Sequence, residues 1–133
     1  MTKTWRIILG CIEVFVAISA IPAAISLLAD PSGAGVGLPQ SLLVDTPFNN
    51  FTIPAIILLV VIGLGNVLGA YHSFSKNSLG GVVGMLLGFI LMIWIGVQVY
   101  FIGYSFSLQT LFLIVGIVQL TMGYFYSKAL KTE

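Results

Sequence analysis

The pattern of hydrophobic and polar positions divides the chain into four long apolar stretches joined by three polar connections. The stretches cover residues 7–29, 53–74, 79–101 and 107–127. Each has about 21–23 residues and, at a helical rise of about 1.5 Å per residue, would be about 32–35 Å long, enough to cross the hydrocarbon core of a bilayer. The alternation typical of membrane β-strands is absent. The pattern therefore predicts an all-α membrane protein, a four-transmembrane-helix antiparallel bundle that forms a single domain over residues 1–133.

The three connections differ in length. Residues 75–78 and residues near 103–106 form short turns, so the helices that they join are expected to be antiparallel neighbours. Residues 30–52 form one long outer loop, and a connection of this length is often functional or separately packed.

The long loop contains readable turn and helix signals. The sequence Asp-Pro-Ser-Gly at positions 30–33 fits a type I turn. Residues 39–44 predict a short helix with proline in its first turn. Thr52 is predicted to cap the N-terminus of the second span.

Positive charges predict the orientation of the bundle. The cations precede the first span, lie between the second and third, or follow the fourth: Lys3, Arg6, Lys76, Lys128 and Lys131. Because Lys and Arg are enriched on the cytoplasmic side, both termini are predicted to be cytoplasmic in a bacterial cell (inner) membrane, with residues 30–52 outside. A cleaved signal peptide is the alternative for the first stretch, but its apolar run continues past Pro22.

Composition excludes several function classes. Hydrophobic residues make up 59% and charged residues 7% of the chain, against about 25% charged in ordinary soluble domains. The net charge of +1 provides no basic field for nucleic acid. A single cysteine, Cys11, and a single histidine, His72, leave no disulfide and no Cys/His metal centre within one chain. We therefore expect no metal and no cofactor.

Each span carries a stripe of small and polar residues, which is how helices associate in lipid. The stripe of the first span comprises Gly10, Glu13, Ala17, Ala20 and Ala24. The second and fourth spans carry Gly63, Asn66, Gly69 and Ser73, and Gln109, Phe112, Gly116, Gln119 and Gly123. The stripes predict the faces that meet inside the bundle.

In the third span, Gly80, Gly84 and Gly88 form overlapping GxxxG steps. They indicate close helix packing, either within one chain or in a homodimer, and we favour packing within the chain. Pro22 is expected to kink the first span, which either opens a cavity on the outer side or only adjusts the helix shape.

One group of residues could carry chemistry. Glu13 is the only charged residue well inside a span, about 9 Å from the inner end by helix rise, and Asn66 and Gln119 lie about 12 Å deep. The three are predicted to form one polar layer in which the amides stabilise the carboxylate, with His72 within reach through a water. The layer is either a proton- or cation-coupled site or a hydrogen-bonded cluster that fixes helix register.

An enzyme is not expected. His72 lies on the inner side, whereas Asp30 and Asp45 lie in the outer loop, so a Ser/His/acid set cannot assemble. Glu13 lacks a partner nucleophile.

Two resemblances add to this picture. With the loop sequences at positions 28–33, 37–39 and 46–48, the whole chain resembles uncharacterised small four-span bacterial membrane proteins grouped as DoxX-like. That resemblance implies a four-helix bundle and no particular activity. Glu13 within Cys-Ile-Glu-Val at positions 11–14 is similar to the span-one carboxylate of small multidrug resistance transporters, although residues 30–52 are longer than their loops. That resemblance implies proton-coupled export.

The sequence favours a non-enzymatic accessory or interaction module. It would bind a lipid or other apolar ligand between the first span and the outer loop, with membrane lipids and a partner membrane protein or second copy as partners. The alternative is a small proton-coupled exporter that uses Glu13.

Overall fold

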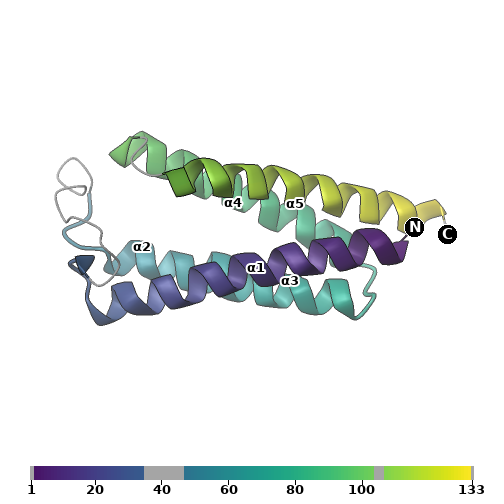
Figure 1. The fold of residues 1–133 in the computed structure, drawn as a ribbon, viewed down its shortest axis with the longest axis horizontal. Coiled ribbons are helices and arrows are strands. Elements are labelled where there is room, and N and C mark those ends of the chain that lie inside the picture. The colour runs from purple at the N-terminus through teal and green to yellow at the C-terminus, as the bar shows by residue number, and fades with distance from the viewer. Residues whose placement is uncertain (1, 35–46, 104–106, 133) are drawn as a thin grey trace.

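The computed structural model describes residues 2–34, 47–103 and 107–132, whose regular secondary structure is helical (Figure 1). The elements are α1 (Thr2–Ala29), α2 (Thr52–Ile57), η3 (Leu58–Leu64), α3 (Gly65–Phe74), α4 (Gly80–Ile102) and α5 (Ser107–Thr132). Together they form four rods packed side by side as a bundle. The predicted all-α class and bundle architecture are confirmed.

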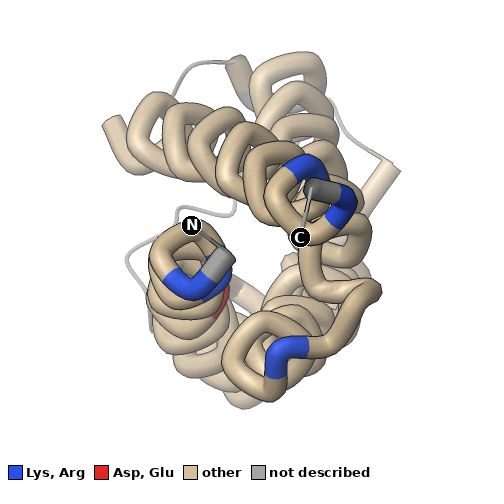
Figure 2. The backbone as a smooth tube through the Cα atoms, turned by 90° about the vertical axis from the view of Figure 1, so that its right-hand side faces the viewer, with Lys and Arg blue, Asp and Glu red and all other residues tan. Residues whose placement is uncertain are grey.

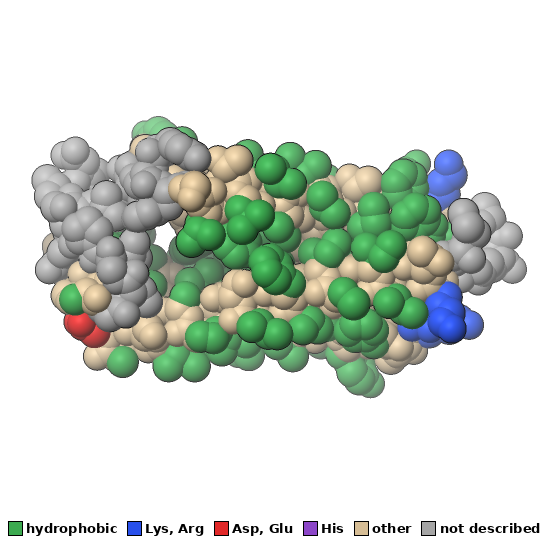
Figure 3. All heavy atoms as spheres, viewed as in Figure 1, with side chains coloured by type: hydrophobic (Ala, Val, Ile, Leu, Met, Phe, Trp, Pro, Cys, Tyr) green, Lys and Arg blue, Asp and Glu red, His purple; other side chains and the backbone are tan. Residues whose placement is uncertain are grey.

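All four rods have the length and composition of membrane spans. The segments suited to cross a membrane have 27, 23, 21 and 25 residues and run over Lys3–Ala29, Thr52–Phe74, Gly80–Tyr100 and Ser107–Lys131. Large apolar side chains cover the outside of the bundle along its length (Figure 3). Such a surface suits lipid and would be unfavourable in water. The chain is a small four-span integral membrane protein.

The second span contains a π-helical segment that the sequence pattern did not predict. In η3 the hydrogen bonds reach one residue further than in an α-helix, and the N–H of Gly65 points to the carbonyl of Val60. Gly63, within η3, lies so close to α1 that an added Cβ would be 2.7 Å from Ile21 Cγ1. The wider turn resets the helical face, so that α3 enters the bundle with Asn66 and Ser73 buried.

The rods are arranged as two helix pairs. In one pair α1 runs along η3 and α3, and in the other α4 runs along α5 (Figure 1). The pairs meet through contacts of α1 with α5 and of α3 with α4. At the end of the bundle that holds α2, the α4–α5 pair leans away from the α1–α2 pair.

The buried faces match the predicted stripes. In α1, residues at positions 10, 13, 17, 20 and 24 are all buried. One apolar cluster joins α1, η3 and α4 through Val16, Ala20, Ile62, Leu91 and Ile95. Pro22 does not interrupt α1, which runs unbroken to Ala29.

The α4–α5 pair is packed backbone against backbone. A Cβ added to Gly88 would lie 2.6 Å from the backbone nitrogen of Leu120, and one added to Gly123 would lie 2.6 Å from that of Met85. Of the other predicted packing glycines, Gly84 faces the side chain of Leu9 in α1, and Gly80 faces the ring of Tyr126. These glycines therefore make close contacts within this chain.

The described part of the long loop bears out one local prediction and overturns another. The N–H of Gly33 donates to the carbonyl of Asp30 at 3.1 Å, which confirms the turn at positions 30–33. The prediction that Thr52 caps the second span was wrong. Thr52 is the first residue of α2, and its N–H donates to Asn50 Oδ1 at 3.0 Å, because Asn50 forms an Asx turn two residues earlier. The predicted helix at 39–44 lies outside the described residues.

All the lysine and arginine residues lie at one end of the bundle, the end that faces the viewer in Figure 2. This end holds the N-terminal part of α1, the turn between α3 and α4, and the C-terminal part of α5. In that turn Lys76 adopts a positive φ of 59°, and the N–H of Asn77 donates to the carbonyl of His72. This clustering is the geometry that the charge pattern predicted.

Candidate polar site inside the bundle

Glu13 lies in the interior of the bundle. Its side chain is fully buried on the inward face of α1. The hydroxyl of Ser73, also fully buried, donates to Glu13 Oε1 at 2.7 Å. Glu13 is thus tied to α3, in the same helix pair as α1.

Gly69 makes room for this carboxylate. An added Cβ at Gly69 would collide with Glu13 Oε2 and would lie 2.9 Å from Glu13 Cδ. It would also lie 2.5 Å from Leu87 Cδ1, on α4. Oε2 therefore lies between the Gly69 backbone and α4, and no hydrogen-bond partner reaches it from the described residues.

Two buried amides form a second contact that joins the helix pairs. Asn66 Nδ2 donates to the carbonyl of Ile62, in η3, at 2.7 Å. Gln119 Nε2, on α5, donates to Asn66 Oδ1 at 2.8 Å. Gln119 Oε1 is buried, and no partner reaches it from the described part of the chain.

The structure places the three predicted layer residues inside the bundle but groups them differently from the prediction. Asn66 and Gln119 are hydrogen-bonded to each other, whereas the hydroxyl of Ser73, and not an amide, donates to Glu13. Ser73 is the residue that the sequence analysis did not assign to the site. A signal for it existed, since Ser73 follows Asn66 by seven residues on the same helical stripe.

Two nearby basic side chains are engaged elsewhere. Arg6 Nη1 donates to the carbonyls of Ser73 and Phe74 at 3.4 and 3.1 Å. Arg6 therefore caps the C-terminus of α3, where carbonyls lack helical partners and the helix dipole is negative. The His72 ring nitrogen Nδ1 lies 2.9 Å from the Leu68 carbonyl.

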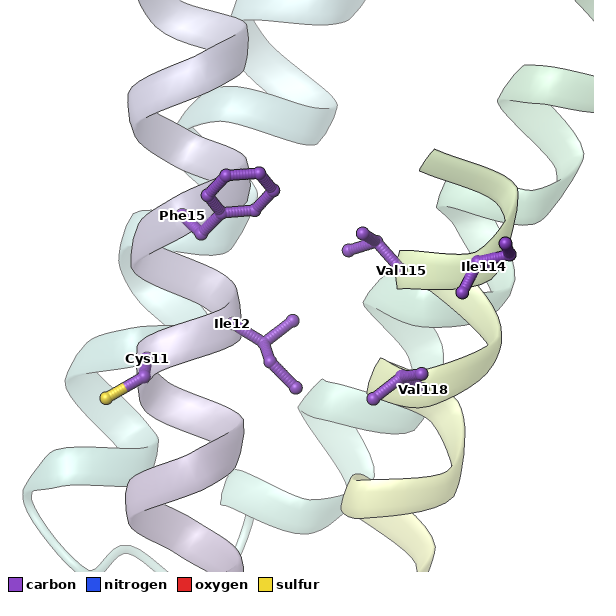
Figure 4. Close-up of a pocket in the computed structure, with 6 residues that line it drawn as sticks. All are labelled: Cys11, Ile12, Phe15, Ile114, Val115 and Val118. Carbon is purple, nitrogen blue, oxygen red and sulfur yellow. The ribbon is translucent and has the colours of Figure 1, made fainter. Parts of the chain in front are cut away.

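Two apolar grooves lie on the sides of α1. The first, with a volume of about 280 Å³, separates α1 from α5 and is lined by Cys11, Ile12, Phe15, Ile114, Val115 and Val118 (Figure 4). The second, of about 390 Å³, lies between α1 and the second span, and Pro22 lines it. In the first groove, Ile12 and Val118 immediately adjoin Glu13 and Gln119 in sequence, so the α1–α5 groove runs alongside the polar layer.

Within the described ranges, no group of three or more His, Cys, Asp or Glu side chains is placed to hold a metal ion. Comparison with protein-family models, with curated proteins and with solved structures found no match.

Proposed function

We propose that this four-span membrane protein is a non-enzymatic accessory module that binds an apolar chain, such as a lipid acyl chain, in the groove between α1 and α5. The observation that carries the proposal is the groove itself, whose lining is almost entirely apolar and comes from both helix pairs (Figure 4). An occupant would contact α1 on one side and α5 on the other. The module would sit in a bacterial inner membrane with both termini in the cytoplasm.

The groove differs in place from the site first expected. The sequence predicted a ligand between the first span and the outer loop, of which residues 35–46 lie outside the described part. The described grooves instead lie along α1, next to Phe15 in one case and Pro22 in the other. Phe15 is stacked on Phe112, with ring centroids 6.1 Å apart, and this aromatic pair bridges α1 and α5 at the groove.

Lipid retention by groove variants tests the proposal. Val118→Trp fills the groove, and Val82→Trp makes the same change on an exposed position of α4 that does not line it. The proteins are purified from membranes of defined phospholipid, and bound lipid is counted by native mass spectrometry. We expect several-fold less retained lipid in Val118→Trp than in wild type, and no loss in Val82→Trp. Equal retention by both variants, with helix content preserved, contradicts the proposal.

One observation favours the exporter as a second candidate. Glu13 is a fully buried carboxylate with one oxygen that no side chain or backbone group satisfies in the described residues. Intramembrane carboxylates commonly belong to ion or proton pathways. The test is efflux of a lipophilic cation such as ethidium from proteoliposomes under a pH gradient. An exporter requires efflux by wild type that Glu13→Gln abolishes, and wild-type vesicles without gradient-driven efflux rule this function out.

A further inference from the structure

The orientation of the two buried amides follows from one carbonyl. The Ile62 carbonyl can only accept a hydrogen bond, so the group of Asn66 that faces it at 2.7 Å is the NH₂. Asn66 Oδ1 then faces Gln119, which must present its own NH₂. As a result Gln119 Oε1 points away from Asn66 and needs a donor that no described residue supplies.

Glu13 also has one oxygen that receives a hydrogen bond from the described residues and one that does not. Ser73 has one hydroxyl hydrogen, which it donates to Oε1, so Oε2 is a second acceptor that receives no donor from the described part of the chain. Oε2 lies against Gly69, which is three residues after Asn66 on the same face of α3, and α1 packs against both α3 and α5. Among the described residues, two acceptor oxygens of the layer therefore lack a donor. One lies beside Gly69, and the other belongs to the amide that is hydrogen-bonded to Asn66, three residues earlier on α3.

Among the described residues, no charged side chain is placed to balance Glu13. Arg6 lies two helical turns earlier on α1 and donates to the end of α3. On α3, His72 is engaged with Leu68, and α4 contains no Asp, Glu, Lys, Arg or His. On α5, the hydroxyl of Tyr126 donates to the Asn77 carbonyl, and Lys128 and Lys131 are exposed.

We propose that the layer formed by Glu13, Ser73, Asn66 and Gln119 binds one monovalent cation, a proton or Na⁺, at Glu13 Oε2, with Gln119 Oε1 as the second free oxygen. A water molecule could satisfy both oxygens, but it would leave the carboxylate charge uncompensated in a buried site. A proton turns Oε2 from an acceptor into a donor, whereas Na⁺ takes both oxygens as hard ligands. Cation binding at this layer does not depend on lipid binding in the groove. It would make the protein an exporter only if the protein also carries a substrate across the membrane.

Infrared spectroscopy of a selectively labelled protein tests the site without altering it. The chain contains two glutamates, Glu13 and Glu133. In Glu133→Gln protein grown with side-chain ¹³C-glutamate, Glu13 is the single labelled carboxyl group. Spectra are recorded in lipid nanodiscs over a range of pH, and at fixed pH with Na⁺ added against choline as the control.

A labelled carboxylic acid band identifies the proton as the cation. A labelled carboxylate band that shifts with Na⁺, but not with choline, identifies Na⁺. In either case Gln119→Leu, which removes the second oxygen, should move the midpoint of the response by up to about tenfold in cation concentration. The variant loses either the acceptor for the proton of the carboxylic acid or one oxygen ligand of Na⁺. Gln98→Leu, in the separate contact between Gln98 and Gln109, should not move it.

A labelled carboxylate band that responds neither to pH nor to Na⁺ overturns the proposal. An unmoved midpoint in Gln119→Leu overturns the role of Gln119 Oε1. Neither result bears on lipid retention in the groove, so this proposal and the proposed function fail separately.

Discussion

Single atoms decide how tightly the buried carboxylate is held. Gly69 provides the space for Glu13 Oε2, Ser73 supplies the hydrogen for Oε1, and Leu87 approaches from α4. Because protein interiors are close-packed, a methyl group added at this point has no free volume to enter.

We expect Gly69→Ala to destabilise the protein. Its Cβ would collide with the Glu13 carboxylate and with Leu87, and overpacking of this kind costs about 1–3 kcal/mol. Gly96→Ala is the matched control, because nothing lies within 4 Å of a Cβ added there and alanine is the better helix former. The free energy of unfolding, measured by denaturant titration in mixed micelles, should fall in the first variant and hold or rise in the second. Equal values would place Gly69 away from Glu13.

A double-mutant cycle measures the amide contact between the helix pairs. Asn66→Leu and Gln119→Leu each remove one partner of the 2.8 Å hydrogen bond, so the double variant should lose less stability than the sum of the two. Interhelical hydrogen bonds in membranes average about 0.6 kcal/mol, which sets the expected coupling. The pair Ser73→Ala and Gln98→Leu, whose residues belong to different contacts, is the control and should be additive. Additivity in the first cycle would contradict the contact.

The sequence predicted the depth of the buried polar residues better than it predicted their hydrogen-bond partners. Helix rise placed Glu13, Asn66 and Gln119 at similar depths, and all three are buried on the predicted faces. The choice of Ser73 as the donor to Glu13 depends on how far α3 is rotated about its axis. The π-helical segment η3 sets that rotation, and no residue pattern in the sequence predicted a π-helix there.

The helices differ in what holds them together. The α4–α5 pair is in backbone contact through glycines, whereas α1 and α3 are joined by a buried hydrogen bond and by the Arg6 cap. The small-residue stripes predicted the faces that meet, because close approach in lipid needs small side chains. They did not predict which helix each glycine would face, since Gly84 and Gly88 lie on one stripe and face different helices.

Two alanine substitutions on this stripe should have unequal effects. At Gly88 an added Cβ meets backbone atoms of α5, which cannot move without separating the helices, whereas at Gly84 it meets the end of the Leu9 side chain, which can change rotamer. Gly88→Ala should therefore lower the thermal unfolding temperature in detergent more than Gly84→Ala. The reverse order would show that the α4–α5 contact is looser than described.

The π-helical segment should tolerate loss of a residue. Deleting Val61 from η3 lets the wide turn close to an α-helical one, so the residues of α3 keep their inward face. Deleting Leu68 from α3 instead turns the residues on one side of the deletion by about 100° relative to those on the other, which separates the buried faces of Asn66 and Ser73. The fraction of protein that elutes as a folded monodisperse species should be higher for the first deletion. Equal yields would argue against this role for η3.

For the whole molecule, length and hydropathy were enough to predict the class and the number of spans. The hydrophobic pattern could not predict that the α4–α5 pair leans away from α2, because that arrangement depends on which stripe packs against which and not on span length. The same limit applies to the grooves beside α1, one of which lies against α5 and the other against the second span.

Cysteine accessibility in cells tests the orientation. In a Cys11→Ala background, Ala34→Cys should react with a membrane-impermeant maleimide added outside, and Lys76→Cys should react only after the cytoplasmic face is opened. The reason is that the lysine and arginine residues lie at the end of the bundle that contains Lys76, and such residues are enriched on the cytoplasmic side. Labelling of position 34 from the cytoplasmic side alone would reverse the topology.

The contacts of Glu13 also bear on how the protein enters the membrane during synthesis. Chains are made from the N-terminus, so α1 and the second span reach the bilayer before α4 and α5 exist. The donor to Glu13 is Ser73, and the acceptor for Asn66 is the Ile62 carbonyl of its own helix, so both costly polar groups find a partner within the first pair. Gln119 arrives last and binds an acceptor that is already in place. The first hairpin can therefore insert into lipid before the second is made. The hydrogen bond between Gln119 and Asn66 then forms when the two helix pairs associate.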